Sequence, residues 1–177
     1  DGRNQMGSSK AMSAYYAAAL LGMAYGDAQV VSIGSTLAAL EICAAKMWYH
    51  VKKDGMLYEK DFTEENRIMG ILWSNKRESG LWFAPSEWRE ARVGIQVLPL
   101  LPISEVLFSD VNYVKELVEW AMPALKRKDI GEEMKGFVYA LQAIYDNDGA
   151  LKNVESLKGF EDGNSMTNLL WWIYSRG

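Results

Sequence analysis

The chain has 177 residues, of which 49% are hydrophobic and 24% charged, proportions that suit one globular domain and exclude a disordered chain. Its net charge of −4, from 19 Lys and Arg against 23 Asp and Glu, argues against a nucleic-acid partner, which usually requires a basic surface. One cysteine and one histidine cannot form an internal disulfide or a His/Cys metal site, so we expect no metal.

The first third of the chain shows the spacing of two helices. The Ala- and Leu-rich run 8–25 predicts the first helix, with Ser8 or Ser9 as its N-terminal cap and Gly26 at its end. A second helix is expected from Asp27 to about residue 52, because its apolar residues recur every three or four positions.

The middle of the chain reads differently from both ends. Residues 54–85 hold short apolar pieces around a charged turn, which indicates a small hairpin or an irregular excursion. Helical spacing then resumes, and Pro123 is expected to kink or split one of the later helices. We place these helices near residues 86–97, 103–109, 111–127, 131–146, 149–158 and 164–175.

No linker divides the chain, so we interpret residues 1–177 as a single, mainly α-helical domain of antiparallel helix pairs. A membrane span needs roughly 18–20 apolar residues. The richest apolar stretch is shorter than this, because it is interrupted by Gly22, Gly26 and Asp27, so we expect no membrane partner. We also expect a monomer.

The opening DGRNQMGSSKAMSAYY resembles the signature Asp-Gly-x-Asn-Gln-Glu-Ser-x-Ser-Glu-Ala of the endo-1,3-β-glucanases of glycoside hydrolase family 81. Five further stretches, two of which overlap, are similar to the family, particularly to its plant members. They are GSTLAALEICAAKMWYHV, GILWSNKRESGLWFAPSEWREARVGIQVLPLLPISEVLFSD, ELVEWAMPAL, WAMPALKRKDIGEEMKGFVYALQAIYD and GFEDGNSMTNLLWWIYSR. The resemblance covers essentially the whole chain.

The resemblance implies the C-terminal part of an (α/α)₆ toroid, with further domains upstream. It implies inverting hydrolysis of internal β-1,3-glucosidic bonds, without a metal or organic cofactor, by one carboxylic acid and one carboxylate. It also favours an extracellular or cell-wall location. In the family the acid is an Asp that would lie upstream of this chain, and the base comes from the two glutamates of the signature. Their four-residue spacing would put both on one helix face.

This sequence departs from the family at both glutamate positions, which are Met6 and Lys10, and Gly7 replaces the usual serine. A thioether does not take a proton from water, and an ordinary lysine is already protonated at neutral pH. General-base assistance is worth about 10²–10⁴ in rate. We therefore predict that this chain lacks turnover.

Other residues can still bind sugar. Asp1, Asn4 and Gln5 match the family and can hydrogen-bond sugar hydroxyls, although capping and turn formation explain them equally well. Aromatic side chains stack on glucose rings, or else pack beneath a long loop. The aromatic candidates are Trp73, Trp82, Phe83 and Trp88.

Three acidic residues are candidates for replacement carboxylates. Glu87 and Glu90 lie three apart and can share a helix face, for which a solvated surface is the commoner interpretation. Glu41 lies in an apolar helix, where a structural role is favoured over catalysis.

Three alternatives to an enzyme stay open: a non-catalytic β-glucan-binding or scaffold protein that kept the fold, a solenoid-type interaction module, and a non-functional fragment. Met6 and Lys10 favour the first of these. A solenoid would need a fixed repeat, and only a weak Asp-Gly echo precedes the first and last helices.

Overall fold

The computed structural model describes residues 3–161 and 163–176, and within them it confirms the mainly helical class. Its α-helices are α1 (Ser9–Tyr25), α2 (Ala28–Trp48), α3 (Lys60–Glu65), α4 (Arg89–Val97), α5 (Ser104–Leu107), α6 (Val111–Ala121), α7 (Glu132–Gln142), α8 (Asn147–Glu155) and α9 (Met166–Tyr174). Its strands are β1 (Asn4–Gln5), β2 (Ile71–Trp73) and β3 (Arg77–Glu78), and a 3₁₀-helix, η1, spans Met122–Lys126.

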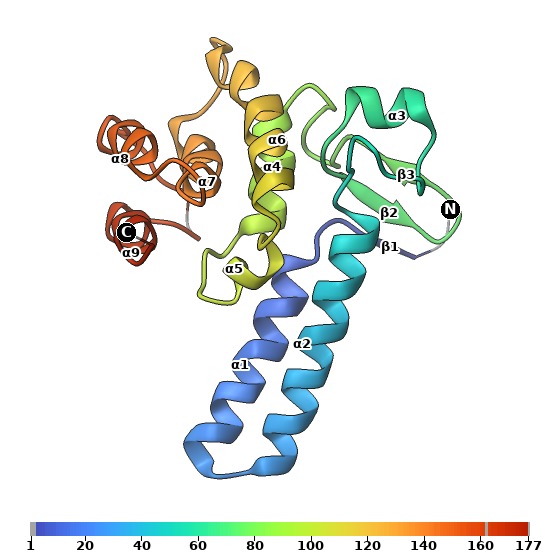
Figure 1. Ribbon diagram of the computed structural model, residues 1–177, viewed down its shortest axis with the longest axis vertical. Helices are drawn as coiled ribbons and strands as arrows, with labels where there is room; N and C mark the ends of the chain where they lie inside the picture. The colour runs from blue at the N-terminus through green and yellow to red at the C-terminus, as the bar shows by residue number, and fades with distance from the viewer. Residues whose placement is uncertain (1–2, 162, 177) are drawn as a thin grey trace.

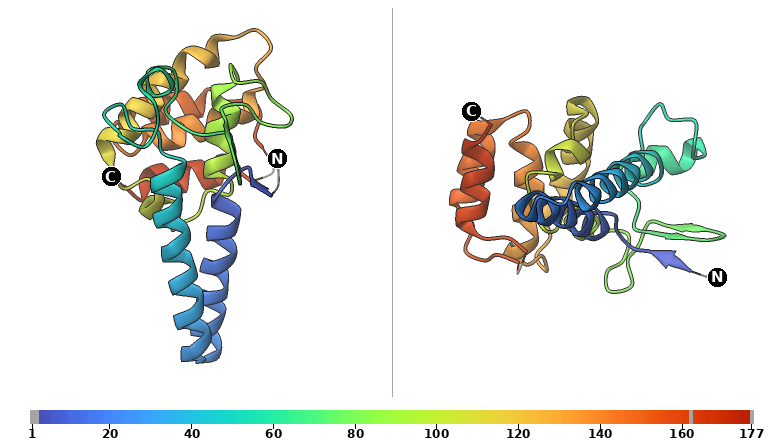
Figure 2. Two further views of the ribbon diagram at one scale, coloured as in Figure 1. Left: turned by 90° about the vertical axis from the view of Figure 1, so that its right-hand side faces the viewer. Right: turned by 90° about the horizontal axis from the view of Figure 1, so that it is seen from below.

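Helices α1 and α2 form a long hairpin that projects from the rest of the molecule (Figures 1 and 2). Gly26 ends α1 in the left-handed conformation, at a φ of 69°, and the Asp27 carboxylate then accepts hydrogen bonds from two backbone N–H groups of α2. Both turn residues were predicted. The helices approach closely at Gly34, where an added Cβ would lie 2.6 Å from the backbone nitrogen of Ala19.

The expectation that no segment matches a membrane span was wrong. Gly22, Gly26 and Asp27 all precede α2 and leave its 21 residues with a mean hydropathy of 1.5 over their most apolar window. Only 22% of that window is buried by the described chain. Length and composition alone do not separate a spanning helix from one that packs inside a larger protein.

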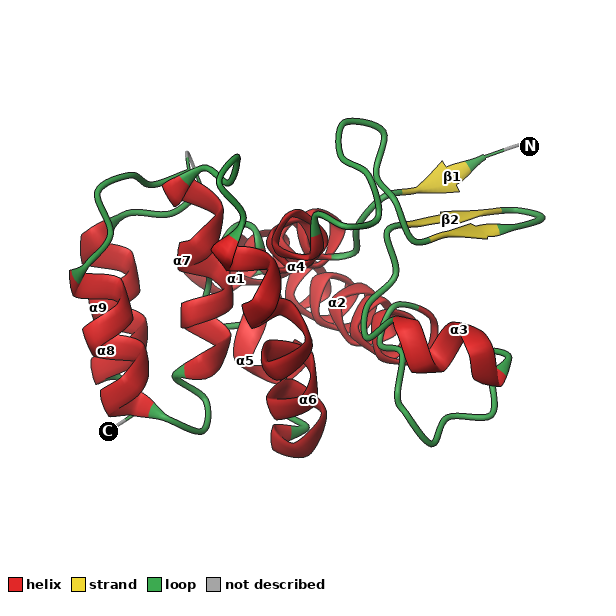
Figure 3. Cartoon of the chain, turned by 90° about the horizontal axis from the view of Figure 1, so that it is seen from above, coloured by secondary structure: helices red, strands yellow, loops and turns green. Residues whose placement is uncertain are grey.

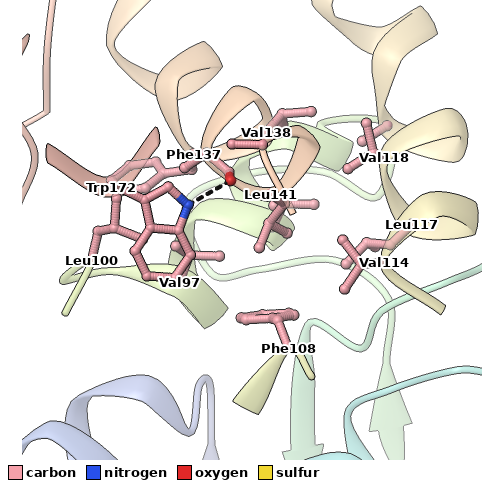
Figure 4. Close-up of a cluster of buried hydrophobic side chains, with 14 of the residues drawn as sticks. Val97, Leu100, Phe108, Val114, Leu117, Val118, Phe137, Val138, Leu141 and Trp172 are labelled. Carbon is pink, nitrogen blue, oxygen red and sulfur yellow. Dashed lines mark hydrogen bonds between the residues drawn. The ribbon is translucent and has the colours of Figure 1, made fainter. Parts of the chain in front are cut away.

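The main core lies among α4, α6, α7, α8 and α9 (Figure 4). Trp172 is fully buried there, and its indole N–H donates a hydrogen bond of 2.7 Å to the Ala140 carbonyl. The neighbouring Trp171 is 42% exposed on the outer face of α9. A buried Trp needs a partner for its N–H, and the helix α7 carbonyl supplies it.

The region 54–85 contains the predicted hairpin, formed by β2 and β3, together with the short helix α3. Strand β1 adds to its free edge, so the sheet order is β1-β2-β3 with antiparallel pairing (Figure 3). Later in the chain, α6 ends at Ala121 and continues as the 3₁₀-helix η1, which contains Pro123. The predicted split is therefore confirmed, since proline cannot donate the next α-helical hydrogen bond.

Candidate functional site

The opening motif is divided between a strand, a bend and a helix. Asn4 and Gln5 form β1 and pair with Trp73 and Leu72 of β2, whereas α1 begins only at Ser9. The expectation that positions 6 and 10 share one helix face was therefore wrong. Pairing with β2 keeps the backbone extended up to Gln5, so position 6 lies before the helix.

Ser8 occupies the N-cap position of α1, but it makes no side-chain capping bond to the helix. Its hydroxyl and its backbone N–H both donate to the side-chain oxygen of Gln96 in α4, each at 3.2 Å. Ser9 donates to the carbonyls of Ile95 and Leu98, at 2.9 and 2.6 Å. The serines thus fix the start of α1 onto the end of α4, which corrects the capping prediction.

Met6 lies half-buried in an apolar cluster. The buried members of this cluster are Ile71, Leu81, Ala84 and Ala91. Trp73, Trp88 and Ile95 pack on the same cluster as Met6. The thioether of Met6 therefore lies in apolar, partly aromatic surroundings, at the first of the two positions where the resemblance implies a glutamate.

Lys10 has a different environment. It is exposed as the second residue of α1, and it makes no ion pair or hydrogen bond within the described part of the chain. No acidic residue occupies the first turn of α1. The Lys10 side chain is therefore exposed to solvent, away from the apolar cluster that holds Met6.

The polar residues of the motif are held by α2. The Gln5 amide donates a 2.7 Å hydrogen bond to Glu41, and the Gln5 carbonyl accepts one of 2.6 Å from the Tyr49 hydroxyl. Burial, assisted by the negative charge of Glu41, raises the pKa of Tyr49, so this hydroxyl stays a donor. Glu41 thus has a structural contact, as predicted, and Asn4 is exposed. Asp1 lies outside the described residues.

Two of the aromatic candidates are exposed beside a groove. Trp82 is 66% and Phe83 54% exposed. Together with neighbours from the loop 79–86, and with Phe62 and Arg77, they line an open groove of about 720 Å³. Flat aromatic faces in an open groove suit the apolar faces of sugar rings.

The other two aromatic candidates are packed rather than free. The Trp73 indole N–H donates a 2.9 Å hydrogen bond to Glu78. That bond, with a second from Lys76, lowers the pKa of Glu78, so this groove carboxylate is ionised at neutral pH and is not a proton donor. Trp88 is half-buried, and the Arg127 guanidinium lies 5.1 Å from its ring centroid.

Glu90 is buried, so the solvated-face interpretation was wrong for it. Its side chain is 2% exposed and accepts hydrogen bonds of 2.7 and 3.2 Å from Arg127. Hydrogen bonding to Glu90 raises the pKa of Arg127. Glu90 therefore forms an ion pair of two hydrogen bonds with Arg127 and is not a free carboxylate. Glu87 contributes its backbone carbonyl to the same arginine.

Sequence reasoning missed Gln96 and Arg127. Gln96 is 1% exposed, and the hydrogen bonds of its side-chain amide reach Met6 and Ser8 of the opening motif. A signal was available, because Gln96 is the one polar side chain in the apolar block VGIQVLPLLP. Among the described residues, no group of three or more His, Cys, Asp or Glu is arranged to hold a metal ion.

The helical fold and the opening motif indicate that the chain is related to the glycosyl hydrolases. The family described as "Glycosyl hydrolase family 81 C-terminal domain" matches residues 1–173, and the chain belongs to this family.

Relatives and a solved structure agree with this assignment. The chain is 66% identical to a glucan endo-1,3-beta-D-glucosidase of Glycine max over 99% of its own length and 26% of that protein. It is 29% identical to a protein of the same name from Acetivibrio thermocellus, over 98% of the chain and 22% of that protein. It therefore spans about a quarter of the length of these curated relatives.

A glycoside hydrolase family 81 protein from Clostridium thermocellum, solved in a mutant form, is similar in structure with a TM-score of 0.80. The sequence identity is 26%, and the match covers 98% of this chain and 23% of that one.

Proposed function

We propose that this chain is the β-1,3-glucan-binding, C-terminal part of an endo-1,3-β-glucanase-type toroid, and that it does not hydrolyse glucan as it stands. It would form a single domain within a longer protein that contributes the general acid. Binding would be monomeric and would need no cofactor. The names of the relatives support the glucan substrate.

One contrast carries this proposal. The side chains at positions 6 and 10 cannot act as a base, but the backbone around them is held in place. Met6 and Lys10 offer sulfur in an apolar cluster and a solvated ammonium, so neither position can take a proton from the attacking water. The backbone around them is nevertheless held by hydrogen bonds from α2 and α4. The backbone of the segment is therefore fixed in place, although neither side chain can act as a general base.

Hydrolysis is tested by restoring the carboxylates. In the intact protein we expect no release of reducing sugar from laminarin, and activity in the Met6→Glu/Lys10→Glu double variant, with each single variant separating the two positions. The gain should reach about 10²–10⁴-fold, the usual contribution of a general base. Turnover by the unaltered protein would refute the inactive part of the proposal.

Binding is tested separately with laminarihexaose, by calorimetry and tryptophan fluorescence. Trp82→Ala removes an exposed ring from the groove and should weaken binding about tenfold, if one sugar ring stacked on an aromatic face contributes about 1–1.5 kcal/mol. Trp171→Ala is the matched control, because Trp171 is also exposed but lies on α9, away from the groove. Equal effects of the two substitutions, or no binding at all, would contradict a glucan site in the groove.

A further inference from the structure

Gln96 connects the two most distinctive stretches of the sequence. It lies in the last turn of α4, and its side chain reaches the opening motif, about ninety residues earlier in the chain. Its carboxamide is buried, with the residue 1% exposed. A buried amide costs free energy unless its donors and acceptor are matched, so its partners indicate what the residue is for.

The partners of Gln96 fix the orientation of its amide. The Ser8 backbone N–H can only donate, and it meets the side-chain oxygen at 3.2 Å. The Met6 carbonyl can only accept, and it meets the side-chain nitrogen at 3.2 Å. Reversing the amide would break both bonds, so one orientation is defined by chemistry alone.

These two contacts hold both peptide planes that flank Gly7. The Met6 carbonyl belongs to the plane before Gly7, and the Ser8 N–H belongs to the plane after it. Each peptide unit is rigid, so fixing one group in each plane removes the freedom that a glycine would otherwise allow. The side chain at position 6 then leaves the backbone in one direction.

Gly7 itself lies against α4. A Cβ added there would be 2.9 Å from the backbone oxygen of Ile95, a contact closer than real side chains make. The bend therefore packs on α4 more tightly than a serine at this position would allow. Glycine permits the approach, and Gln96 supplies the rigidity that glycine lacks.

We propose that Gln96 is a positioning residue for the opening motif. It directs the side chain at position 6 into the apolar cluster that contains Trp73 and Trp88. Its relevance to sugar rests on the proposed glucan-binding function. The direction of position 6 decides whether a side chain there lies beside the aromatic residues or swings away from them. Gln96 touches no substrate in this role and acts through the backbone of residues 6–8.

The direction of Met6 can be measured without any sugar. With methyl-labelled methionine, the Met6 methyl resonance reports ring currents from the tryptophans of its cluster, and the other eight methionines serve as internal references. Gln96→Leu should move the Met6 resonance and speed hydrogen exchange at the Ser8 amide. Gln142→Leu is the matched control: Gln142 is another buried glutamine, bonded to Asp146 and Asn153 far from the motif.

Affinity for laminarihexaose provides the second measurement, in the intact protein. Gln96→Leu should weaken binding about tenfold, the scale of one buried hydrogen-bond pair. Gln96→Glu should bind more tightly at pH 5 than at pH 8, because burial favours the neutral carboxyl, which can both donate to Met6 and accept from Ser8, whereas the ionised form has lost the donor. Gln96→Leu should show no such recovery.

An unmoved Met6 resonance in Gln96→Leu overturns the proposal, whatever the sugar result. A shifted resonance with unchanged laminarihexaose affinity also overturns it as a statement about the glucan site. If the unaltered protein binds no laminarihexaose, the proposed function fails, and the methyl and exchange data still decide whether Gln96 directs position 6.

Discussion

Replacing Arg127 tests the ion pair that it forms with the buried Glu90. The Glu90 side chain is 2% exposed, and Arg127, itself 23% exposed, satisfies it with two hydrogen bonds. Arg127→Met keeps much of the arginine's apolar length but leaves the carboxylate without a compensating charge. Because an unpaired buried charge is far more costly than no charge at all, the single variant should be much less stable than the double variant Glu90→Gln/Arg127→Met.

The magnitude follows from that burial. Arg127→Met should lower the free energy of unfolding by about 3–5 kcal/mol, and adding Glu90→Gln should recover about half of the loss.

Urea unfolding followed by tryptophan fluorescence measures these differences. Asp129→Ala is the control, because Asp129 also pairs with Arg127, at 3.1 Å, but is 61% exposed and should cost at most about 0.5 kcal/mol. A loss below about 1 kcal/mol in Arg127→Met, or a double variant no more stable than the single one, would refute the reasoning.

Three further substitutions test other parts of the fold. Gly34→Ala places a Cβ 2.6 Å from the Ala19 nitrogen, so α1 and α2 must separate, and we expect a loss of about 1–3 kcal/mol in urea unfolding. Lys10→Glu replaces a cation in the first turn of α1 by an anion and should raise stability by about 0.3–1 kcal/mol at low salt. Burial lowers the pKa of His50 to about 3, while an unfolded histidine protonates near 6.5. Stability should therefore fall by about 2 kcal/mol from pH 7 to pH 5, and His50→Phe, which keeps the stack on Tyr113, should remove most of that fall.

Each of these expectations has its own control. Gly55→Ala adds the same methyl group outside the α1–α2 contact and should not reproduce the effect of Gly34→Ala. Lys10→Gln should give part of the gain of Lys10→Glu, and a gain that persists at 1 M salt would contradict a helix-dipole origin. An equal acid-side loss in the His50→Phe variant would show that other groups cause it.

Local signals predicted most of the helices. The first helix was expected at 8–25 and lies at Ser9–Tyr25, because Gly26 and Asp27 act on their immediate neighbours. The end of α2 was placed about four residues too late, since Tyr49 and the residues after it leave the helix to bond with β1 and with residue 67. Periodicity contains no information about such distant partners.

The candidate site depends mainly on long-range contacts, and there the sequence was less informative. Position 6 lies outside the helix because Asn4 pairs with Trp73, far along the chain. Glu90 is buried because Arg127 reaches it from 37 residues away. Residue types identified the aromatic candidates, but only the fold separates exposed Trp82 from the packed Trp73.

The backbone of the opening motif is held by contacts that do not depend on the side chains at positions 6 and 10. Gln96 and Tyr49 hold the backbone of residues 5–8, and neither contact involves the side chain of Met6 or Lys10. The two positions are also unlike each other, one facing an apolar cluster and the other solvent. A carboxylate introduced at position 6 would be partly desolvated by the apolar cluster, whereas one at position 10 would stay in solvent. The environment thus distinguishes the two glutamate positions of the family signature even where both glutamates are gone.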